Sequence, residues 1–335
     1  MATMKAWQYS GVHGGLEKNL VLKDDVPRLG PPGDQELLVE VISASINPAD
    51  YKVPELGLIA KAIISTPATP GADFCGRVAA AGSKVDSFSI GETVVGRLEP
   101  TQHGTLGELI VVRAETCVSL PAGVDPDQGA CLGTAALTAY QSIVSNVKAG
   151  DKVFINGGSG GTGTFAIQIA KTLGCHVTAS CSGAKATLCK ELGADEIIDY
   201  TTVDVSQKLK EGGQVFSLAV DFVAKPPDLY KASDDYLLPE GKFVQVGGGM
   251  SVADFKTTLP RLFLPGFLGG GHRKFEFFIV KNKRDDLGLL VKWLGEGKLK
   301  AVIDEEFDFE HVPQAFEKLK KGKATGKIVV HVAKK

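Results

Sequence analysis

The sequence predicts an α/β protein that combines a small β-barrel domain with a doubly wound parallel-sheet domain. Its 335 residues are enough for two domains. Residues 1–125 carry short apolar segments separated by glycine and proline, which is typical of a small barrel. From residue 126 onward, strand-like and helix-like segments alternate, and this alternation indicates βαβ units around a parallel sheet.

The first domain, residues 1–125, is expected to consist mostly of strands. Clusters of glycine and proline at 30–33, 66–71 and 120–123 separate its apolar segments and mark turns. The expected strands cover residues 37–45, 76–82, 92–96 and 108–112.

The second domain, residues 126–275, is expected to begin with a helix at 128–144, which is rich in alanine and leucine. Apolar segments that predict parallel strands follow at 152–156, 176–181, 196–200, 218–223 and 241–247. Between them, the sequence predicts helices at 161–173, 184–192 and 203–210.

The tail, residues 276–335, again resembles the first domain and is expected to return to it and complete it. It carries a predicted helix at 284–295, an apolar and acidic segment at 301–307, a helix at 312–320 and a final strand at 326–332.

Composition excludes several classes of protein. With 44% hydrophobic and 23% charged residues, the chain has enough apolar material to fold. The net charge is -2 and there is no long basic run, so the sequence does not indicate non-specific binding of nucleic acid. No apolar stretch reaches the length of a membrane span, and the start lacks a secretory signal, so we expect a cytoplasmic protein. The six cysteines form no C-x2-C pair and are expected to be free thiols.

A glycine-rich loop at 156–163 follows a predicted strand and opens a predicted helix. Gly158, Gly160 and Gly163 fit the G-x-G-x-x-G pattern of dinucleotide-binding loops. A side chain there would block the approach of the backbone to a pyrophosphate, which helix N-terminal N–H groups then hold. The sequence therefore predicts a nucleotide site of Rossmann type, and a glycine-rich turn without a ligand is the alternative. The expected contacts are Gly158, Ser159, Gly160, Gly161, Thr162 and Gly163.

The end of the second strand selects the cofactor. NAD sites usually place an acidic residue there for the ribose 2′-OH, whereas this chain has Ser182 and Lys185. A hydroxyl and an ammonium suit a 2′-phosphate, so NADPH is favoured over NADH. The alternative is that Lys185 is a solvated lysine at a helix start.

With these features the chain resembles the medium-chain dehydrogenase/reductase superfamily over nearly its whole length. The resemblance implies a GroES-like first domain, a Rossmann nucleotide domain and a C-terminal return. Within the superfamily it is most similar to the zinc-independent quinone oxidoreductase-like and enoyl reductase-like branch. The matching segments are Ser45–Lys52, Pro70–Gly82, Gly133–Tyr140, Leu192–Tyr200 and Ala324–Val330.

The resemblance also implies that this chain holds no catalytic zinc. Zinc-dependent relatives have cysteine at the position of Asn47, His-Glu at the positions of Ala72 and Asp73, and a third ligand near Thr134. Asn47, Ala72 and Thr134 do not supply the three N, S or O ligands of a catalytic zinc site. We therefore expect no metal.

The activity that the resemblance implies is NADPH-dependent reduction of an activated C=C bond, in an enone or enoyl compound, or of a quinone. Hydride goes to the β-carbon, and the developing enolate needs a hydrogen-bond donor or a proton. Asn47, Tyr51 and Lys52 are the candidate catalytic residues. Solvent is an alternative proton source, in which case Tyr51 packs in the core and Lys52 is solvated.

Further site residues follow from the resemblance alone. It places Asn47 near the nicotinamide and the substrate, Thr134 at the carboxamide and Tyr200 near the adenosine phosphate. Core packing is the alternative for Tyr200 and Phe222. The remaining expected cofactor contacts are Phe222 and Gly247 at strand ends beside the nicotinamide, and Lys327 at the cofactor phosphates.

The apolar loop 259–272 has two interpretations, a substrate lid or a subunit interface, because the following segment 274–280 suits strand pairing across a homodimer. Two other functions stay open at this stage. One is an NADPH-binding structural or interaction protein with little catalysis. The other is a stand-alone enoyl reductase that works with a biosynthetic synthase. The expected partner is a small-molecule substrate.

Overall fold

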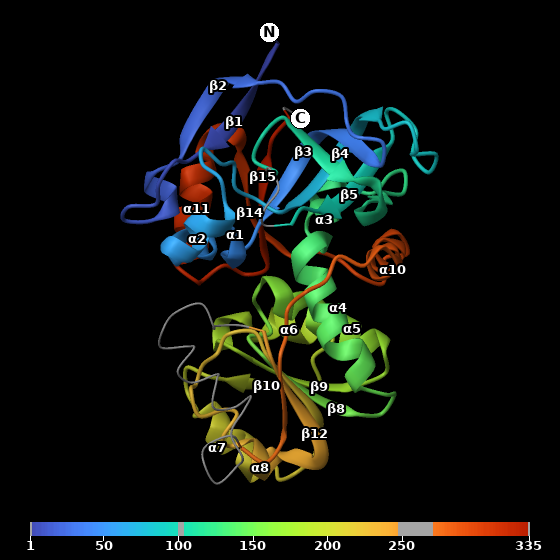
Figure 1. The fold of residues 1–335 in the computed structure, drawn as a ribbon. Helices are drawn as coiled ribbons and strands as arrows, with labels where there is room; N and C mark the ends of the chain where they lie inside the picture. The colour runs from blue at the N-terminus through green and yellow to red at the C-terminus, as the bar shows by residue number, and fades with distance from the viewer. Residues whose placement is uncertain (1, 100–103, 247–270, 334–335) are drawn as a thin grey trace. The chain divides into compact units, whose positions relative to one another are not determined.

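A computed structural model describes residues 2–99, 104–246 and 271–333 and divides the chain into two compact units (Figure 1). Unit 1 comprises Met1–Leu137 and Asn282–Lys335, and unit 2 comprises Thr138–Lys281. This architecture confirms the predicted α/β class.

Unit 1 is built on a mixed sheet of seven strands in the order β14-β15-β3-β4-β5-β7, with β6 pairing with β3. Only the β14–β15 pair is parallel. In Figure 1 the red strand β15, from the end of the chain, lies beside the blue strand β3. The strands of this sheet are β3 (Glu36–Ile46), β4 (Asp73–Ala81), β5 (Thr93–Arg97), β6 (Leu109–Arg113), β7 (Val118–Ser119), β14 (Ile303–Asp308) and β15 (Lys327–His331).

A separate antiparallel pair, β1 (Thr3–Gln8) and β2 (Val21–Pro27), was not among the expected strands. Around the sheet lie short helices, namely η1 (Leu16–Lys18), α1 (Pro48–Lys52), η2 (Pro54–Leu56), α2 (Leu58–Ile63), η3 (Ala114–Thr116), α3 (Pro126–Ala130), η4 (Leu132–Ala136), α10 (Arg284–Gly295), η8 (Phe309–His311) and α11 (Val312–Lys320). Helices α10 and α11 have the expected bounds.

The core of unit 1 joins both ends of the chain. Trp7, Phe74 and Phe316 are buried in one apolar cluster, and the Trp7 indole N–H donates to the Phe309 carbonyl oxygen at 2.6 Å. The burial of these apolar side chains favours folding of the tail against the first domain, since each removes a large apolar area from water.

The expected helix 128–144 is interrupted. It begins as α3, passes through the π-helical segment η4 and continues as α4 (Leu137–Ile143). Helix α3 packs on β3 and β4, and its Asp127 side chain accepts a hydrogen bond from Ser43 on β3. Residues 126–137 therefore lie in unit 1, whereas the expected division at 125 placed them in the nucleotide domain.

Unit 2 is a doubly wound domain with six parallel strands in the order β10-β9-β8-β11-β12-β13. In sequence numbering this is the 3-2-1-4-5-6 order of a Rossmann sheet. The strands are β8 (Lys152–Asn156), β9 (His176–Cys181), β10 (Glu196–Asp199), β11 (Phe216–Asp221), β12 (Leu237–Gln245) and β13 (Lys274–Phe277).

The helices of unit 2 alternate with these strands, as the sequence predicts. They are η5 (Val144–Asn146), α5 (Gly161–Thr172), η6 (Gly183–Lys185), α6 (Ala186–Glu191), α7 (Val205–Glu211) and α8 (Ser233–Tyr236). On one face of the sheet, the aromatic rings of Phe154, Phe216 and Tyr236 pack edge to face against one another. Strand β13 pairs in parallel with β12 and so belongs to this chain's own sheet; pairing of segment 274–280 across a homodimer stays a prediction.

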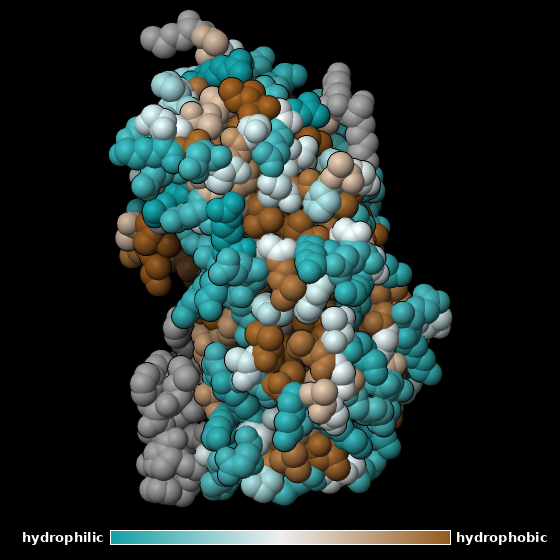
Figure 2. Space-filling model, turned by 90° about the vertical axis from the view of Figure 1, so that its right-hand side faces the viewer, coloured by the Kyte–Doolittle hydropathy of each residue, from teal (hydrophilic) through white to brown (hydrophobic). Residues whose placement is uncertain are grey.

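The surface in Figure 2 carries separate groups of brown apolar side chains among teal hydrophilic ones. The most exposed large apolar side chain of the described residues is Leu58 on α2, at 84%. Among the described residues, every helix is too short or too polar to span a bilayer. All six cysteines are free and buried.

Candidate functional site

The glycine-rich loop joins β8 to α5 and is fixed at its start by strand β9. The Gly157 N–H donates to the Ser180 hydroxyl at 2.9 Å, and the Gly158 N–H donates to the Ser180 carbonyl oxygen at 2.8 Å. Gly157 has a φ of 86°, which a side chain would strain. The positive φ of Gly157 therefore explains why the tight turn begins with a glycine.

Two of the three pattern glycines are required by packing. A Cβ on Gly163 would lie 2.1 Å from the Gly157 carbonyl oxygen, and one on Gly158 would lie 2.9 Å from the Ala179 Cβ. These glycines let helix α5 and the loop approach each other and strand β9 closely.

The third pattern glycine, Gly160, is not required by the fold. A Cβ there would meet only the Gly157 carbonyl oxygen, at 3.4 Å. Its φ of -81° and ψ of 174° suit any residue. Gly160 is the N-cap of α5 and supplies no side-chain cap to the first N–H groups of the helix. Open space beside an uncapped helix N-terminus is what a bound pyrophosphate needs, so these residues fit a dinucleotide.

The expected contacts Ser159, Gly161 and Thr162 lie in this loop and the first turn of α5. Ser182 is the N-cap of η6, which follows β9, and Lys185 is the last residue of η6; both are half-buried. The structure thus brings the loop and the second-strand end together at the carboxyl edge of one sheet, where ligands bind in doubly wound folds.

A carboxylate that the sequence analysis did not consider also lies at this edge. Asp199, at the end of β10, accepts hydrogen bonds from the Thr201 hydroxyl at 2.7 Å and the Thr201 N–H at 2.9 Å. These bonds, the hydroxyl first, and one from the Gly183 N–H lower the pKa of Asp199. Asp199 ends the third strand rather than the second, so the cofactor pattern, which concerns the second strand, did not reveal it.

The remaining expected contacts in unit 2 also follow strand ends. Tyr200 is 58% exposed, so core packing is not its role, and Phe222 is half-buried after β11. Gly247 and most of the loop 259–272 lie outside the described residues. Exposed Tyr200 and Val223 give this edge apolar surface at its rim.

Unit 1 holds a buried polar cluster around Asn47, which is the residue before helix α1. The Asn47 side-chain N–H donates to Asp73 Oδ2 at 2.8 Å, and the Thr134 hydroxyl donates to Asp73 Oδ1 at 2.5 Å. Asp73 is fully buried on β4. Thr134 reaches it because Gly133 lets η4 pass closely: a Cβ on Gly133 would lie 2.7 Å from Asp73 Oδ1.

Lys327 completes the cluster from the other end of the chain. Its ammonium donates to Asn47 Oδ1 at 2.5 Å and to the Ile46 carbonyl oxygen at 3.2 Å. It lies 3.9 Å from Asp73 Oδ2, and both side chains are almost completely buried. A buried charge is costly unless it is paired, so the Lys327 ammonium and the Asp73 carboxylate depend on each other.

Two further charged groups adjoin this cluster. Arg97 on β5 donates to the Thr134 hydroxyl at 3.1 Å and to Asn282 Oδ1 at 2.9 Å. Asp50 accepts from the Asn47 backbone N–H at 2.6 Å. Burial, together with the nearby Asp73 charge, raises the pKa of Asp50 to about 7, against the opposing effects of the Asn47 N–H, Lys327 and Arg97.

Tyr51 and Lys52, the other expected catalytic residues, do not join this cluster by any hydrogen bond among the described residues. The Tyr51 ring packs against the core of unit 1, with the Lys320 ammonium 5.0 Å from its centroid. Burial raises the pKa of Tyr51 above the ordinary value of a phenol, which makes the hydroxyl a weaker acid. Lys52 is half-buried.

The residues at the expected metal positions do not fit zinc. The Asn47 amide oxygen holds the Lys327 ammonium, Ala72 has no donor atom, and the Thr134 hydroxyl is bonded to Asp73. A cation placed among these atoms would face an ammonium within hydrogen-bond distance of its first ligand.

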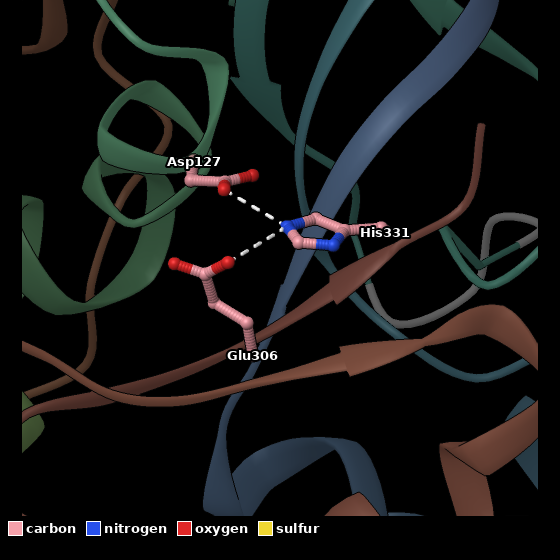
Figure 3. Close-up of side chains that lie close together, drawn as sticks. All are labelled: Asp127, Glu306 and His331. Carbon is pink, nitrogen blue, oxygen red and sulfur yellow. Dashed lines mark hydrogen bonds and ion pairs between the residues drawn. The ribbon is translucent and has the colours of Figure 1, made fainter. Parts of the chain in front are cut away.

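A separate cluster in unit 1 joins elements far apart in the sequence (Figure 3). Asp127 of α3 and Glu306 of β14 both point at one ring nitrogen of His331 on β15, with the His331 Nε2 2.9 Å from Asp127 Oδ2 and 3.4 Å from Glu306 Oε2. Among the described residues, this is the one group of three potential metal ligands within reach of one another. Its atoms already bond to each other, and Asp127 also accepts from Ser43.

Sequence reasoning missed Asp73, Asp50 and Arg97 as members of the polar cluster. The sequence analysis named Asp73 only as the residue at the position of the glutamate in the His-Glu pair of zinc-dependent relatives. A signal was present, because an aspartate inside the apolar strand segment that follows Pro70 is an unusual residue to bury.

The comparisons with known proteins agree with this architecture. Residues 33–122 match the model of the alcohol dehydrogenase GroES-like domain, and residues 192–330 match a model described as zinc-binding dehydrogenase. The solved quinone oxidoreductase from Coxiella burnetii superposes with a TM-score of 0.86 at 29% identity, covering 99% of this chain and all of that one.

Two relatives extend over the whole chain. The trans-enoyl reductase pgmF of Aspergillus terreus is 43% identical, covering 99% of this chain and 97% of the relative. The chloroplastic quinone-oxidoreductase homolog of Spinacia oleracea is 31% identical over 98% of both chains. The chain is therefore an oxidoreductase of the medium-chain dehydrogenase/reductase superfamily and belongs to its quinone oxidoreductase-like and enoyl reductase-like branch.

Proposed function

We propose that this protein is an NADPH-dependent, zinc-independent reductase that transfers hydride to an activated C=C bond, in an enone or enoyl compound, or to a quinone. The observation that carries the proposal is that Asn47, at a position where zinc-dependent relatives have a ligand, is hydrogen-bonded to Asp73 and to the Lys327 ammonium instead. Interconversion of an alcohol and a ketone in zinc-dependent relatives uses a Lewis acid at these positions. A conjugated C=C bond accepts hydride at its β-carbon without one.

The named relatives support the acceptor class. One relative is called a trans-enoyl reductase and the other a quinone-oxidoreductase homolog, and the first shares more of this chain's residues. The C=C bond is therefore the leading acceptor and the quinone the second. The reduction also needs a proton, because hydride transfer to the β-carbon leaves an enolate that must be protonated.

The residues proposed to hold NADPH are the loop residues Gly158–Gly163, with the uncapped N-terminus of α5 beside the pyrophosphate. Ser182 and Lys185 are proposed to hold the 2′-phosphate by hydrogen bonding and charge. Bound NADPH supplies the hydride. Tyr200, Phe222, Gly247 and Thr134 stay proposed cofactor contacts, as the resemblance implies.

The proton donor has three candidates. Tyr51 is a phenol that carries its proton at neutral pH, although its raised pKa makes it a weaker acid. Lys52, the next residue, is half-buried, and solvent is the third candidate. Asn47 is proposed to lie near the acceptor, where its orientation affects how the acceptor binds.

The test uses NADPH labelled with deuterium at the transferring position and a panel of acceptors. We expect oxidation of NADPH by an enone, an enoyl thioester or a quinone, with deuterium at the β-carbon of the reduced alkene. The saturated ketone of the same skeleton is the control and should not react. Turnover of the saturated ketone alone would contradict the proposal. Tight NADPH binding without any turnover would instead favour a binding protein.

A further inference from the structure

We propose that Lys327 is a positioning residue whose buried ammonium fixes the orientation of the Asn47 side-chain amide. The inference rests on the reductase function proposed above, and it assigns Lys327 a partner other than the cofactor phosphates. It follows from which atoms in the cluster donate hydrogen bonds and which accept them.

The amide of asparagine has two orientations that exchange its oxygen and nitrogen. An ammonium only donates hydrogen bonds, and the Lys327 ammonium lies 2.5 Å from Asn47 Oδ1. An ionised carboxylate only accepts them, and Asp73 Oδ2 lies 2.8 Å from Asn47 Nδ2. The reversed amide would place its N–H group against the ammonium and its oxygen against the carboxylate. The two charges therefore select one orientation from opposite sides.

The burial of Lys327 points to the same role. Its side chain is 3% exposed, and two of its three N–H groups have partners in Asn47 and Ile46. An ammonium so enclosed is poorly placed to reach a phosphate outside the cluster. Since a buried lysine is costly, a fold that only needed to fill this space would be as well served by methionine.

The charged side chains around Lys327 determine which charge is left unpaired when Lys327 is removed. The charged side chains that influence this region come from three other elements, namely Asp50 on α1, Asp73 on β4 and Arg97 on β5. Removing Lys327 alone leaves Asp73 buried without its nearest cation. A variant that removes both charges separates this imbalance from the loss of amide orientation.

The experiment is a set of four variants, Lys327→Met, Lys327→Met with Asp73→Asn, Asn47→Ala, and Asn47→Ala with Lys327→Met. For Lys327→Met we expect kcat to fall by roughly 10- to 100-fold, because misplacing a group near the reacting atoms has effects of this size. The Kd for NADPH should stay within about twofold of the wild type, since the proposed loop contacts are untouched.

Two comparisons distinguish positioning from simple charge balance. Adding Asp73→Asn to Lys327→Met should restore thermal stability but not kcat, because neither charge then orients the amide. In the Asn47→Ala background, Lys327→Met should cause no further loss of kcat. Recovery of kcat in the Lys327→Met, Asp73→Asn variant, or independent losses in the Asn47→Ala background, would overturn the inference.

A readout without turnover separates this inference from the proposed function. The side-chain amide protons of Asn47, assigned by their loss in Asn47→Ala, should exchange slowly with solvent in the wild type and faster in Lys327→Met. A wild type without reductase activity that shows this difference would refute the function and keep the orientation. An active wild type in which Lys327→Met leaves the exchange unchanged would refute the orientation alone.

Discussion

The glycine loop of unit 2 and the polar cluster of unit 1 are two sites made in different ways. The loop is a backbone feature of eight consecutive residues, 156–163, whose conformation follows from its glycines. The cluster consists of side chains from the N-cap of α1 and from β4, η4 and β15, and Asn47 and Lys327 are 280 positions apart. A site of the first kind tolerates change wherever its backbone has room. A site of the second kind depends on the balance of its charges.

The largest expected effect breaks the charge balance of the cluster. Asp73→Ala leaves the Lys327 ammonium buried without its carboxylate, and the free energy of unfolding should fall by about 3–5 kcal/mol. Urea unfolding measures this. Asp34→Ala is the control, because Asp34 pairs with Lys84 in an exposed position and its loss should leave stability almost unchanged. Equal effects of the two variants would show that burial does not matter to the cluster.

The next prediction distinguishes Gly163, which the fold requires, from Gly160, which the bound cofactor is expected to require. Gly163→Ala places a Cβ 2.1 Å from the Gly157 carbonyl oxygen and should lower stability by about 1–3 kcal/mol. Gly160→Ala has room for its Cβ and should leave stability unchanged while it weakens NADPH binding by about tenfold or more. Thermal unfolding and NADPH titration test the pair. Unchanged NADPH affinity in Gly160→Ala would argue against a pyrophosphate at this turn.

Asp50, beside the polar cluster, should make the free energy of unfolding depend on pH by an amount of similar size. The pKa of Asp50 is about 7 in the folded protein, above its ordinary value of 3.8. The folded state therefore binds the extra proton, and the contribution of Asp50 to stability is lost as the pH rises through 7. Between about pH 5.5 and about pH 8 this loss should amount to about 2 kcal/mol.

Asp50→Asn removes this dependence and keeps an acceptor for the Asn47 N–H. The difference in unfolding free energy between wild type and variant, measured across this pH range, isolates the contribution of Asp50. A constant difference would mean that Asp50 does not titrate there.

The smallest effect concerns cofactor choice at the end of β9. Lys185→Ala should reduce the preference for NADPH over NADH by about tenfold, since one charge-assisted contact to the 2′-phosphate is lost. Lys190→Ala on the neighbouring helix α6 is the matched control, because Lys190 is exposed. The ratio of kcat/KM for the two cofactors is the measurement. A ratio that Lys185→Ala leaves unchanged would place the 2′-phosphate elsewhere.

The difference between the two sites also explains what the sequence could predict. Strand-helix alternation and the spacing of Gly158, Gly160 and Gly163 are local patterns, so the unit 2 sheet and its loop followed from them. The contact of Thr134 with Asp73 did not, because it joins η4 to β4 and needs Gly133, whose Cβ would lie 2.7 Å from Asp73 Oδ1. Likewise, the pairing of Lys327 with Asn47 arises from antiparallel pairing of β15 with β3, which no local pattern encodes.

We propose that side chains of this chain take the place of a metal in a reductase of activated C=C bonds or quinones. The most direct measurement is the zinc content of the purified protein together with its NADPH-dependent turnover before and after treatment with a chelator. We expect substoichiometric zinc and the same rate of enone or quinone reduction in both samples. Stoichiometric zinc, with turnover that disappears on chelation and returns when zinc is added, would contradict it.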